Sequence, residues 1–255
     1  MTLIETPGSI AVPALDIEGL SYAYPDGTQG LRDVSLRVEQ GERIALIGPN
    51  GAGKSTFLLN LNGILRAQHG AVRVLGETLT DATVRSIRAK IGLLFSNPDD
   101  QLFSPTVLDD VAYGPLHMGF DRDEVLRRSR EALAAVGMAE FEERVPHRMS
   151  LGQKKRVAIA TVLSMGAPIL LLDEPTASLD PMSRRGLIEL LATLPLTIVV
   201  ATHDLAMVAD LLPRTVVLDG GVVIDDRPSA DVLNDARLLY EHQLEPLSAH
   251  GHPHA

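Results

Sequence analysis

The stretch Gly48-Pro49-Asn50-Gly51-Ala52-Gly53-Lys54-Ser55-Thr56 decides the fold. It matches the pattern G-x-x-x-x-G-K-[ST] in full, follows the apolar run 44–47, and opens a helical pattern over 56–62. A strand, a glycine-rich turn and a helix N-terminus form a cradle for phosphate, because successive backbone N–H groups converge on the anion. The alternative is a glycine-rich turn that binds nothing, but such a turn would not need a lysine and a serine directly after the glycines. The sequence therefore predicts a nucleoside triphosphate site, with Lys54 on the β- and γ-phosphates and Ser55 offering its hydroxyl to Mg²⁺.

Length, charge and composition narrow the class of protein. A chain of 255 residues is long enough for one or two compact domains, and zero cysteines exclude disulfides, thiol nucleophiles and thiolate metal sites. The net charge of −10 argues against a large nucleic-acid surface. No apolar run approaches the roughly 18–20 residues that cross a bilayer. The first six residues show no basic, apolar start, so we expect no signal peptide, which fits the cytosol.

A second chemical centre follows the four aliphatic residues 169–172, which read as a strand buried on both faces. Asp173 and Glu174 come at its carboxyl end, where α/β proteins place ligands, and neighbouring strand residues point to opposite faces. Asp173 suits the Mg²⁺ shell, and Glu174 suits contact with an attacking water. The alternative is an acidic strand end that meets solvent. We also expect the apolar strand 197–201 to lie beside this one, so that His203 reaches a γ-phosphate; the alternative is a structural or exposed histidine.

Alternating residues at 15–20 and 34–38, with the turn signal Pro25-Asp26-Gly27 between them, predict an antiparallel β-layer before the phosphate loop. Tyr24 lies near the end of the first strand. Half-buried packing is the ordinary explanation of a strand tyrosine. The functional interpretation is a platform on which a purine base stacks.

The middle of the chain changes to a helical pattern with many exposed charges, over 107–114 and 122–136. Ser150 can cap the helix that follows it. The basic triplet Lys154-Lys155-Arg156 on that helix has the ordinary interpretation of a solvated face. Alternating histidines in 249–255 either bind a divalent transition metal or form a low-complexity tail.

Taken together, the motifs occur in one order: Gly48–Thr56, the loop after the strand at 91–95, Ser150-Leu151-Gly152-Gln153, Asp173-Glu174, Ser178-Leu179-Asp180 and Thr202-His203-Asp204. This order resembles the nucleotide-binding subunit of an ATP-binding cassette (ABC) transporter. The resemblance covers the chain from about Leu15 to Asp225. It implies an α/β fold: a P-loop NTPase (RecA-like) core with an N-terminal antiparallel β-layer and a helical insert.

The resemblance and the composition of the two ends divide the chain into parts. A nucleotide-binding domain is expected over 14–240, with its helical insert at about 97–160. Residues 1–13 are expected to be a flexible segment, and 241–255 a histidine-containing tail.

Roles for single residues also follow from the resemblance. They place ATP on Tyr24, which stacks on adenine, and on the phosphate loop, namely Gly48, Pro49, Asn50, Gly51, Ala52, Gly53, Lys54, Ser55 and Thr56. Ser55 and Asp173 serve Mg²⁺, Glu174 is the catalytic carboxylate, and His203 touches the γ-phosphate. Lys54 joins these two in the catalytic set.

Further residues are implied to act between two copies of the chain. Asp180 belongs to a loop that links two active sites, and the signature motif contacts ATP held by the partner subunit through Ser150, Gly152 and Gln153. One copy of each motif therefore implies a head-to-tail homodimer with two ATP molecules at its interface.

Two positions depart from the family pattern. Leu151 stands where the signature motif has glycine, although Ser150 and the N–H of Gly152 remain. Ser96 stands where the family has a glutamine that reaches Mg²⁺ and reports to the membrane partner. Ser96 is too short for the same contact, and Gln101 is a second candidate for that role.

Within the superfamily, residues 95–103, 109–115 and 152–160 are similar to energy-coupling-factor transporter ATPases, especially cobalt and nickel importers. This implies integral-membrane transmembrane and substrate-binding subunits as partners, no nucleic acid, and a peripheral place on the cytoplasmic face of the inner (cell) membrane. A vitamin or other micronutrient is the alternative cargo. Other classes are a soluble non-transport ABC ATPase working on DNA or the ribosome, a weakly hydrolysing regulatory cassette suggested by Ser96 and Leu151, and a P-loop kinase, which would leave Ser150 and Asp180 unexplained.

Overall fold

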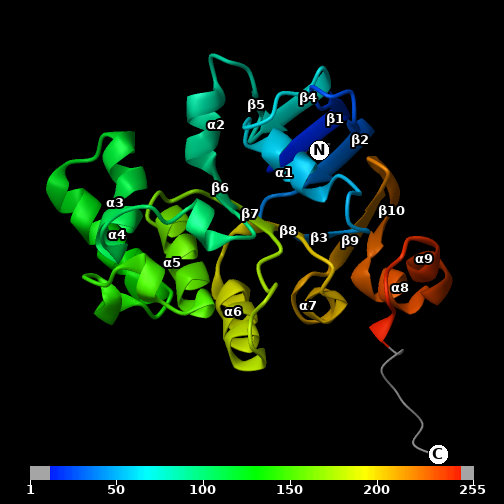
Figure 1. Cartoon of the computed structure of the whole chain (residues 1–255). Coiled ribbons are helices and arrows are strands. Elements are labelled where there is room, and N and C mark those ends of the chain that lie inside the picture. The colour runs from blue at the N-terminus through cyan, green and yellow to red at the C-terminus, as the bar shows by residue number, and fades with distance from the viewer. Residues whose placement is uncertain (1–11, 248–255) are drawn as a thin grey trace, which may run out of the picture.

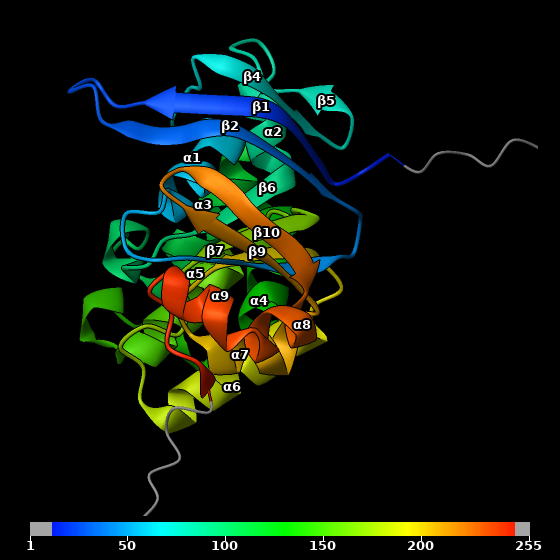
Figure 2. The ribbon, with the colours of Figure 1, turned by 90° about the vertical axis from the view of Figure 1, so that its right-hand side faces the viewer.

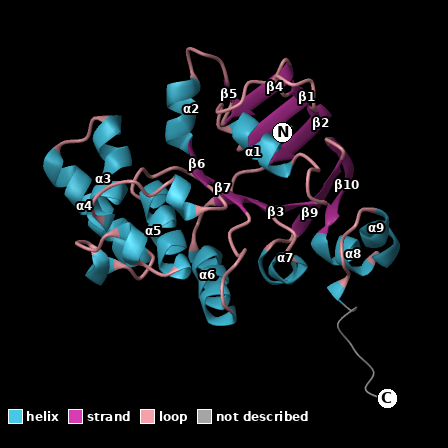
Figure 3. Ribbon diagram, viewed as in Figure 1, coloured by secondary structure: helices cyan, strands magenta, loops and turns pink. Residues whose placement is uncertain are grey.

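The computed structural model describes residues 12–247, which form two sheets and several helices (Figures 1 and 3). The predicted histidine tail at 249–255 and most of the predicted flexible segment 1–13 lie outside the described residues. Within residues 12–247, no helix combines the length and apolar character needed to cross a bilayer.

The central sheet has six strands in the order β10-β9-β3-β8-β7-β6, parallel except for β10 at one edge. The strands are β3 (Arg43–Ile47), β6 (Ile91–Leu94), β7 (Ile169–Asp173), β8 (Thr197–Ala201), β9 (Arg214–Asp219) and β10 (Val222–Pro228). The predicted pairing of β8 with β7 is confirmed, with Asp173 opposite Ala201. Carboxyl ends of parallel strands meet at one edge of a sheet, so the loops after β3, β7 and β8 open on the same side.

The second sheet is antiparallel, in the order β2-β1-β4-β5, as the N-terminal alternation predicts. Its strands are β1 (Leu15–Ala23), β2 (Gln29–Val38), β4 (His69–Val74) and β5 (Glu77–Thr78). Figure 2 shows this sheet above α1 and the central sheet, so that the three form successive layers. The pairing of β1 with β4 joins segments about fifty residues apart, which local patterns do not reveal.

Residues of the central strands alternate between two hydrophobic cores, because successive side chains in a strand point to opposite faces. Ile169 and Leu171 pack toward the antiparallel sheet and α1, whereas Leu170 and Leu172 pack toward the helices on the other face. The helices on the face of the antiparallel sheet are α1 (Lys54–Leu61) and α2 (Val84–Lys90). Those on the other face are α5 (Leu151–Leu163), α6 (Pro181–Thr193), α7 (Leu205–Leu211), α8 (Ser229–Asn234) and α9 (Ala236–Glu241). The continuous apolar run at 169–172 is therefore explained by a strand that is buried on both faces.

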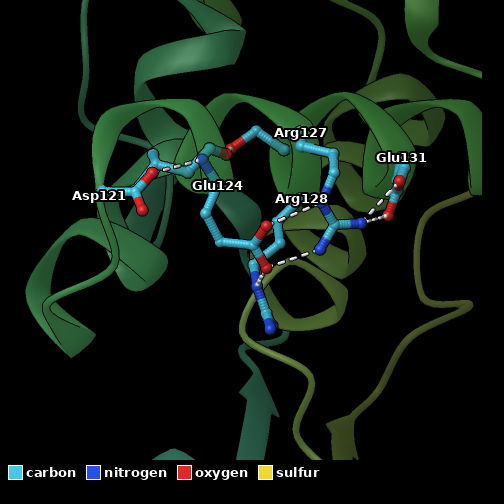
Figure 4. Close-up of polar contacts among 7 residues, drawn as sticks. Asp121, Glu124, Arg127, Arg128 and Glu131 are labelled. Carbon is cyan, nitrogen blue, oxygen red and sulfur yellow. Dashed lines mark hydrogen bonds and ion pairs between the residues drawn. The ribbon is translucent and has the colours of Figure 1, made fainter.

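The predicted helical insert is built around α3 (Val107–Met118), α4 (Arg122–Ala135) and α5, which Figure 1 shows together beside the sheet. Its polar surface explains the many charges in its sequence. Asp121 caps α4, and Figure 4 shows Glu124 joined to Arg127 and Arg128, with Arg127 also joined to Glu131. Such pairs, three or four residues apart, support an exposed helix by a few tenths of a kcal/mol each, roughly. The three short 3₁₀ turns nearby are Pro98–Asp100, Ala139–Phe141 and Pro146–Arg148.

The basic triplet on α5 is not a solvated face, so the interpretation from the sequence is wrong there. Lys155 is buried and reaches the loop after β7. Lys154 pairs with Asp99 at 2.7 Å, and Arg156 donates to the carbonyl oxygens of Val136 and Gly186. All three side chains have partners within the protein, because α5 packs against β6 on one side and against α3 and α4 on the other.

Candidate nucleotide site

The phosphate loop between β3 and α1 depends on two glycines that no other residue could replace without a shift. A Cβ on Gly48 would lie 1.9 Å from the carbonyl oxygen of Leu218, and Gly48 has φ +152°. A Cβ on Gly53, at φ +105°, would lie 2.6 Å from the carbonyl oxygen of Gly30. These are the positions where the backbone needs the freedom of glycine. The sequence motif therefore marks close approaches of the loop to β9 and β2.

The N-terminus of α1 is prepared for an anion. Its N-cap residue is Gly53, which provides no side-chain acceptor, and the first turn carries no acidic residue. The first N–H groups of a helix have no acceptor within the helix, and the helix dipole favours negative charge there. The ammonium of Lys54 donates to the carbonyl oxygens of Gly48 (2.7 Å) and Pro49 (3.1 Å). Burial lowers the pKa of Lys54 from its ordinary value, and the negative charge of a phosphate beside it would favour the charged form.

A cavity of about 330 Å³ opens in front of this loop. Tyr24, Asp173 and Glu174 line it together with most of the phosphate loop, so β1, β3 and β7 contribute to one site. The full lining is Tyr24, Thr28, Gln29, Gly30, Asn50, Gly51, Ala52, Gly53, Lys54, Ser55, Thr56, Asp173 and Glu174. The residues predicted from two distant motifs are thus brought together.

Tyr24 is held at the edge of this cavity. Its hydroxyl lies 2.7 Å from Oγ1 of Thr56, and its ring makes an edge contact with Tyr22, with the ring centroids 5.0 Å apart. Both contacts fix the plane of an aromatic ring beside the phosphate loop. An aromatic ring fixed in this way provides a stacking surface for a base.

Asp173 and Ser55 form the pair of oxygen ligands that the sequence assigns to Mg²⁺. Burial raises the pKa of Asp173, and a hydrogen bond from the Ser55 hydroxyl and the charge of Lys54 act in the opposite direction. Carboxylate and hydroxyl oxygens are the ligands that Mg²⁺ prefers, and it keeps water and substrate phosphates for its other positions. Residues 12–247 contain no group of three or more acidic, histidine or cysteine side chains able to hold a metal. Ser55 and Asp173 would supply two of the ligands of a Mg²⁺ ion bound together with the nucleotide.

Glu174 holds its carboxylate between two residues that follow β8. Its Oε1 lies 2.9 Å from Nδ1 of His203, and the hydroxyl of Thr202 donates to its Oε2 at 3.2 Å. Glu174 has φ 46°, a conformation that residues other than glycine rarely adopt. The predicted neighbours Glu174 and His203 therefore meet at the carboxyl ends of β7 and β8. His203 is exposed and does not line the cavity itself.

The loop after His203 is fixed by contacts that the sequence motifs do not reveal. Asp204 caps α7, and Arg184 of α6 donates to both of its carboxylate oxygens at 2.7 and 2.8 Å. Thr176 adds a third side-chain donor at 2.9 Å. Burial alone would raise the pKa of Asp204, but Arg184 and the other donors hold it below the ordinary value. Arg184 lies four residues after Asp180 in the sequence, and nothing in that local pattern predicts its pairing with Asp204.

The signature motif does not belong to this cavity. Ser150 and Gln153 form a capping box at the start of α5: Gln153 N–H donates to the Ser150 hydroxyl, and Ser150 N–H donates to the Gln153 side chain. Gly152 follows in the first turn, and Asp180 caps α6 by accepting from two backbone N–H groups. Serine, glutamine and aspartate at these positions are thus explained locally as caps. None of the four lines the cavity around Lys54.

Neither candidate for the missing glutamine reaches the cavity. Ser96 is exposed just after β6 and is absent from its lining. Gln101 turns its amide toward α5, where it donates to the carbonyl oxygen of Ala158 (3.0 Å) and to Thr161 (2.8 Å). The structure therefore gives Gln101 a structural contact with α5 in place of the contact with Mg²⁺ that the sequence suggests.

Known proteins place the chain in a family. The family model described as "ABC transporter" matches residues 31–177. A protein of Streptomyces avermitilis classed with ABC transporter ATP-binding proteins is 48% identical over 242 residues, covering 95% of this chain and 92% of its own. The energy-coupling factor transporter ATP-binding protein EcfA of Methanothermobacter thermautotrophicus is 46% identical, covering 88% of this chain and 74% of its own.

Solved structures give the same assignment and confirm the predicted P-loop fold. The protein cbiO1 from Clostridium perfringens, part of the ABC transporter complex cbiONQ, has a TM-score of 0.80 and 36% identity, covering 91% of this chain and 95% of its own. A dimeric ATP-binding cassette bound to ADP and Pi has a TM-score of 0.75 and 29% identity, covering 84% of this chain and 98% of its own. The chain therefore belongs to the ABC transporter family as an ATP-binding, ATP-hydrolysing subunit.

Proposed function

We propose that the chain energises a membrane import complex by binding Mg-ATP between two head-to-tail copies of itself. The observation that carries this proposal is the separation of the signature motif from the cavity. Ser150, Gly152 and Gln153 lie at the start of α5 and do not line the cavity beside the chain's own phosphate loop, so we assign them to ATP on a second copy. The dimeric cassette with ADP and Pi supports the same assembly.

In this proposal the residues around β7 and β8 carry out hydrolysis. Glu174 orients a water for in-line attack on the γ-phosphorus, and His203 and Lys54 stabilise the charge that develops on the phosphate. Mg²⁺, when bound, would neutralise phosphate charge from the side of Ser55 and Asp173. Loss of phosphate then removes the bridge between the two copies, and the dimer opens.

An exposed aromatic patch on the helical insert supports a membrane partner. The patch consists of Phe103, Tyr113 and Leu116: the rings of Phe103 and Tyr113 make an edge contact with centroids 5.1 Å apart, and the exposed Leu116 lies three residues after Tyr113 on the same side of α3. Large apolar side chains gathered at the surface are typical of interaction sites. We assign this patch to the contact with a transmembrane subunit at the cytoplasmic face of the cell membrane. The helical insert would then transmit the opening and closing of the dimer to that subunit.

Cobalt or nickel is the proposed cargo. It rests on the resemblance of residues 95–103, 109–115 and 152–160 to the cobalt and nickel importers, and the likeness to a subunit of the cbiONQ complex supports it. The EcfA relatives support the energy-coupling type of ATPase, and their names state no cargo, so a vitamin or other micronutrient is the alternative. In either case a separate membrane subunit selects the substrate.

The test is to co-purify the chain with its membrane partners, reconstitute the complex in vesicles with ATP, and measure accumulation of cobalt, nickel and candidate vitamins. We expect accumulation of cobalt or nickel that stops in the Glu174→Gln complex. Accumulation of a vitamin and of neither metal would contradict the proposed cargo and favour the alternative. Co-purification with ribosomes or DNA in place of membrane proteins would contradict the transport function.

A further inference from the structure

Lys155 makes contacts that the predicted catalytic residues do not account for. It lies on α5, two residues after Gln153, and its side chain is buried, with 1% of the residue exposed. Its ammonium donates to three backbone carbonyl oxygens: Glu174 at 3.0 Å, Pro175 at 2.7 Å and Ala177 at 3.2 Å. An ammonium has three protons. All of them are used on the single loop that follows β7.

This loop has a backbone that needs support. Glu174 and Ser178 have φ 46° and 61°, both in the left-handed region that disfavours ordinary side chains. Such conformations persist where the surrounding contacts hold them. Lys155 gathers the carbonyl groups that lie between the two strained residues. The Glu174 carboxylate, in turn, is held from the other side by Thr202 and His203.

A charge at this position carries a penalty that an apolar side chain would avoid. Burial lowers the pKa of Lys155 to about 8, and the nearby carboxylates of Glu174 and Asp173 counteract this only in part. No carboxylate pairs with Lys155 among the ion pairs within residues 12–247. The ammonium is therefore stabilised mainly by the three carbonyl groups, whose positions it fixes in return.

We propose that Lys155 is a positioning residue that sets the place of Glu174 relative to the signature helix α5. Lys155 does not line the nucleotide cavity, so it acts through Glu174 and not on ATP. This inference rests on the proposed function, in which α5 contacts the ATP of the partner subunit. Lys155 then forms a rigid link between the signature motif at one ATP and the Glu174 carboxylate at the other, so that closure around one nucleotide aligns the second site.

The test measures ATP turnover of the full-length chain, in its assembled complex, for Lys155→Met and Lys155→Gln. Methionine keeps an unbranched side chain, one atom shorter than that of lysine, and removes every donor, whereas glutamine keeps two N–H donors. We expect kcat of Lys155→Met to fall by about 10- to 100-fold, because small misplacements of a catalytic group have effects of this size. KM for ATP and the calorimetric ATP affinity should stay unchanged, and Lys155→Gln should recover part of kcat. Lys154→Met, one residue away and paired with Asp99, is the matched control.

A double-mutant cycle separates positioning from general support of the fold. Residual single-turnover hydrolysis is compared in Glu174→Gln with and without Lys155→Met. If Lys155 acts through Glu174, the second substitution has no further effect in that background. Equal losses in both backgrounds, a weaker ATP affinity at unchanged kcat, or full activity of Lys155→Met would each overturn the proposal. Loss of turnover in Glu174→Gln alone keeps the proposed function intact whatever Lys155 does.

If Lys155→Met does not fold, as judged by circular dichroism and thermal melting, the glutamine variant carries the test. Lys155→Gln should then show an intermediate kcat with the wild-type KM. If Lys155→Gln has the wild-type kcat and the wild-type rate of phosphate release, the three hydrogen bonds of the lysine are not needed to position Glu174, and the proposal is wrong.

Discussion

Two buried lysines hold backbone carbonyl groups in this protein, and their surroundings assign them different tasks. Lys54 donates to Gly48 and Pro49 inside a cavity, where a phosphate can replace the carbonyl groups as its partner. Lys155 donates to three carbonyl groups of a closed loop and lines no part of that cavity. Both pKa values are lowered by burial. Two buried lysines with lowered pKa values are thus assigned different roles: Lys54 binds the nucleotide, and Lys155 holds the shape of a loop.

Lys54→Ala should weaken binding of Mg-ATP without unfolding the chain. A hydrogen bond to a charged group contributes about 1.5–3 kcal/mol, which corresponds to roughly 10- to 100-fold in the dissociation constant. Isothermal titration calorimetry measures it directly. Lys90→Ala, a change on α2 that breaks an ion pair with Glu77 of β5, is the control and should bind ATP normally. Wild-type affinity in Lys54→Ala would remove the lysine from the phosphate site.

The lowered pKa of Lys155 leads us to predict that the free energy of unfolding depends on pH. The folded pKa of Lys155, about 8, lies below the ordinary lysine pKa of 10.5, so the unfolded chain binds the proton more tightly between these values. The free energy of unfolding contributed by Lys155 therefore rises as pH increases from about 8 to 10.5. Urea unfolding of wild type and Lys155→Met across this range measures the difference, in which other titrating groups cancel. A difference that is constant or falls with pH would contradict the assignment.

At the scale of elements, the contact of β6 with α5 depends on Gly92. A Cβ built there would lie 1.8 Å from Cγ1 of Val162, although Gly92 sits in an otherwise apolar strand with an ordinary backbone. This contact brings the helix that carries the signature motif and Lys155 directly onto the central sheet. Elements this close cannot separate slightly without losing many contacts, because protein interiors are close-packed.

Gly92→Ala should destabilise the fold by about 1–3 kcal/mol, the usual effect of extra volume in a packed core. Val162→Ala in the same chain removes the methyl group that the new Cβ meets. The double variant should then be more stable than the sum of the two single changes predicts. Chemical denaturation of the four proteins gives the coupling. Strict additivity would show that the contact is not the source of the effect.

The elements near the phosphate loop could be predicted well, and those that depend on distant contacts could not. A continuous aliphatic run such as Ile169–Leu172 has one physical explanation, a strand covered on both faces, and the pairing of β7 with β8 followed from it. The charges of Lys154 and Lys155 had two explanations, solvent or a buried partner, and only the tertiary structure decides between them. Gln101 is a similar case, since its amide partner on α5 lies nearly sixty residues away.

At the scale of the whole molecule, the proposed function makes the site incomplete in one chain. Tyr24, the phosphate loop, Asp173 and Glu174 line one cavity, whereas Ser150 and Gln153 are predicted to act on a second copy. The sequence could predict this division only through the resemblance to ABC ATPases. Within one chain, Ser150 and Gln153 are fully explained as a helix cap, so local physics gives no sign of their task across an interface.

The central claim is that ATP joins two copies of this chain, and the mass of the Glu174→Gln variant in solution tests it most directly. Sedimentation velocity is measured with and without saturating Mg-ATP, with Glu174→Gln/Lys54→Ala as the control that should not bind nucleotide. We predict the mass of one chain without ATP, the mass of two chains with ATP, and one chain for the double variant. A single chain under saturating Mg-ATP, with no pairing after assembly on the membrane subunits either, would contradict the account.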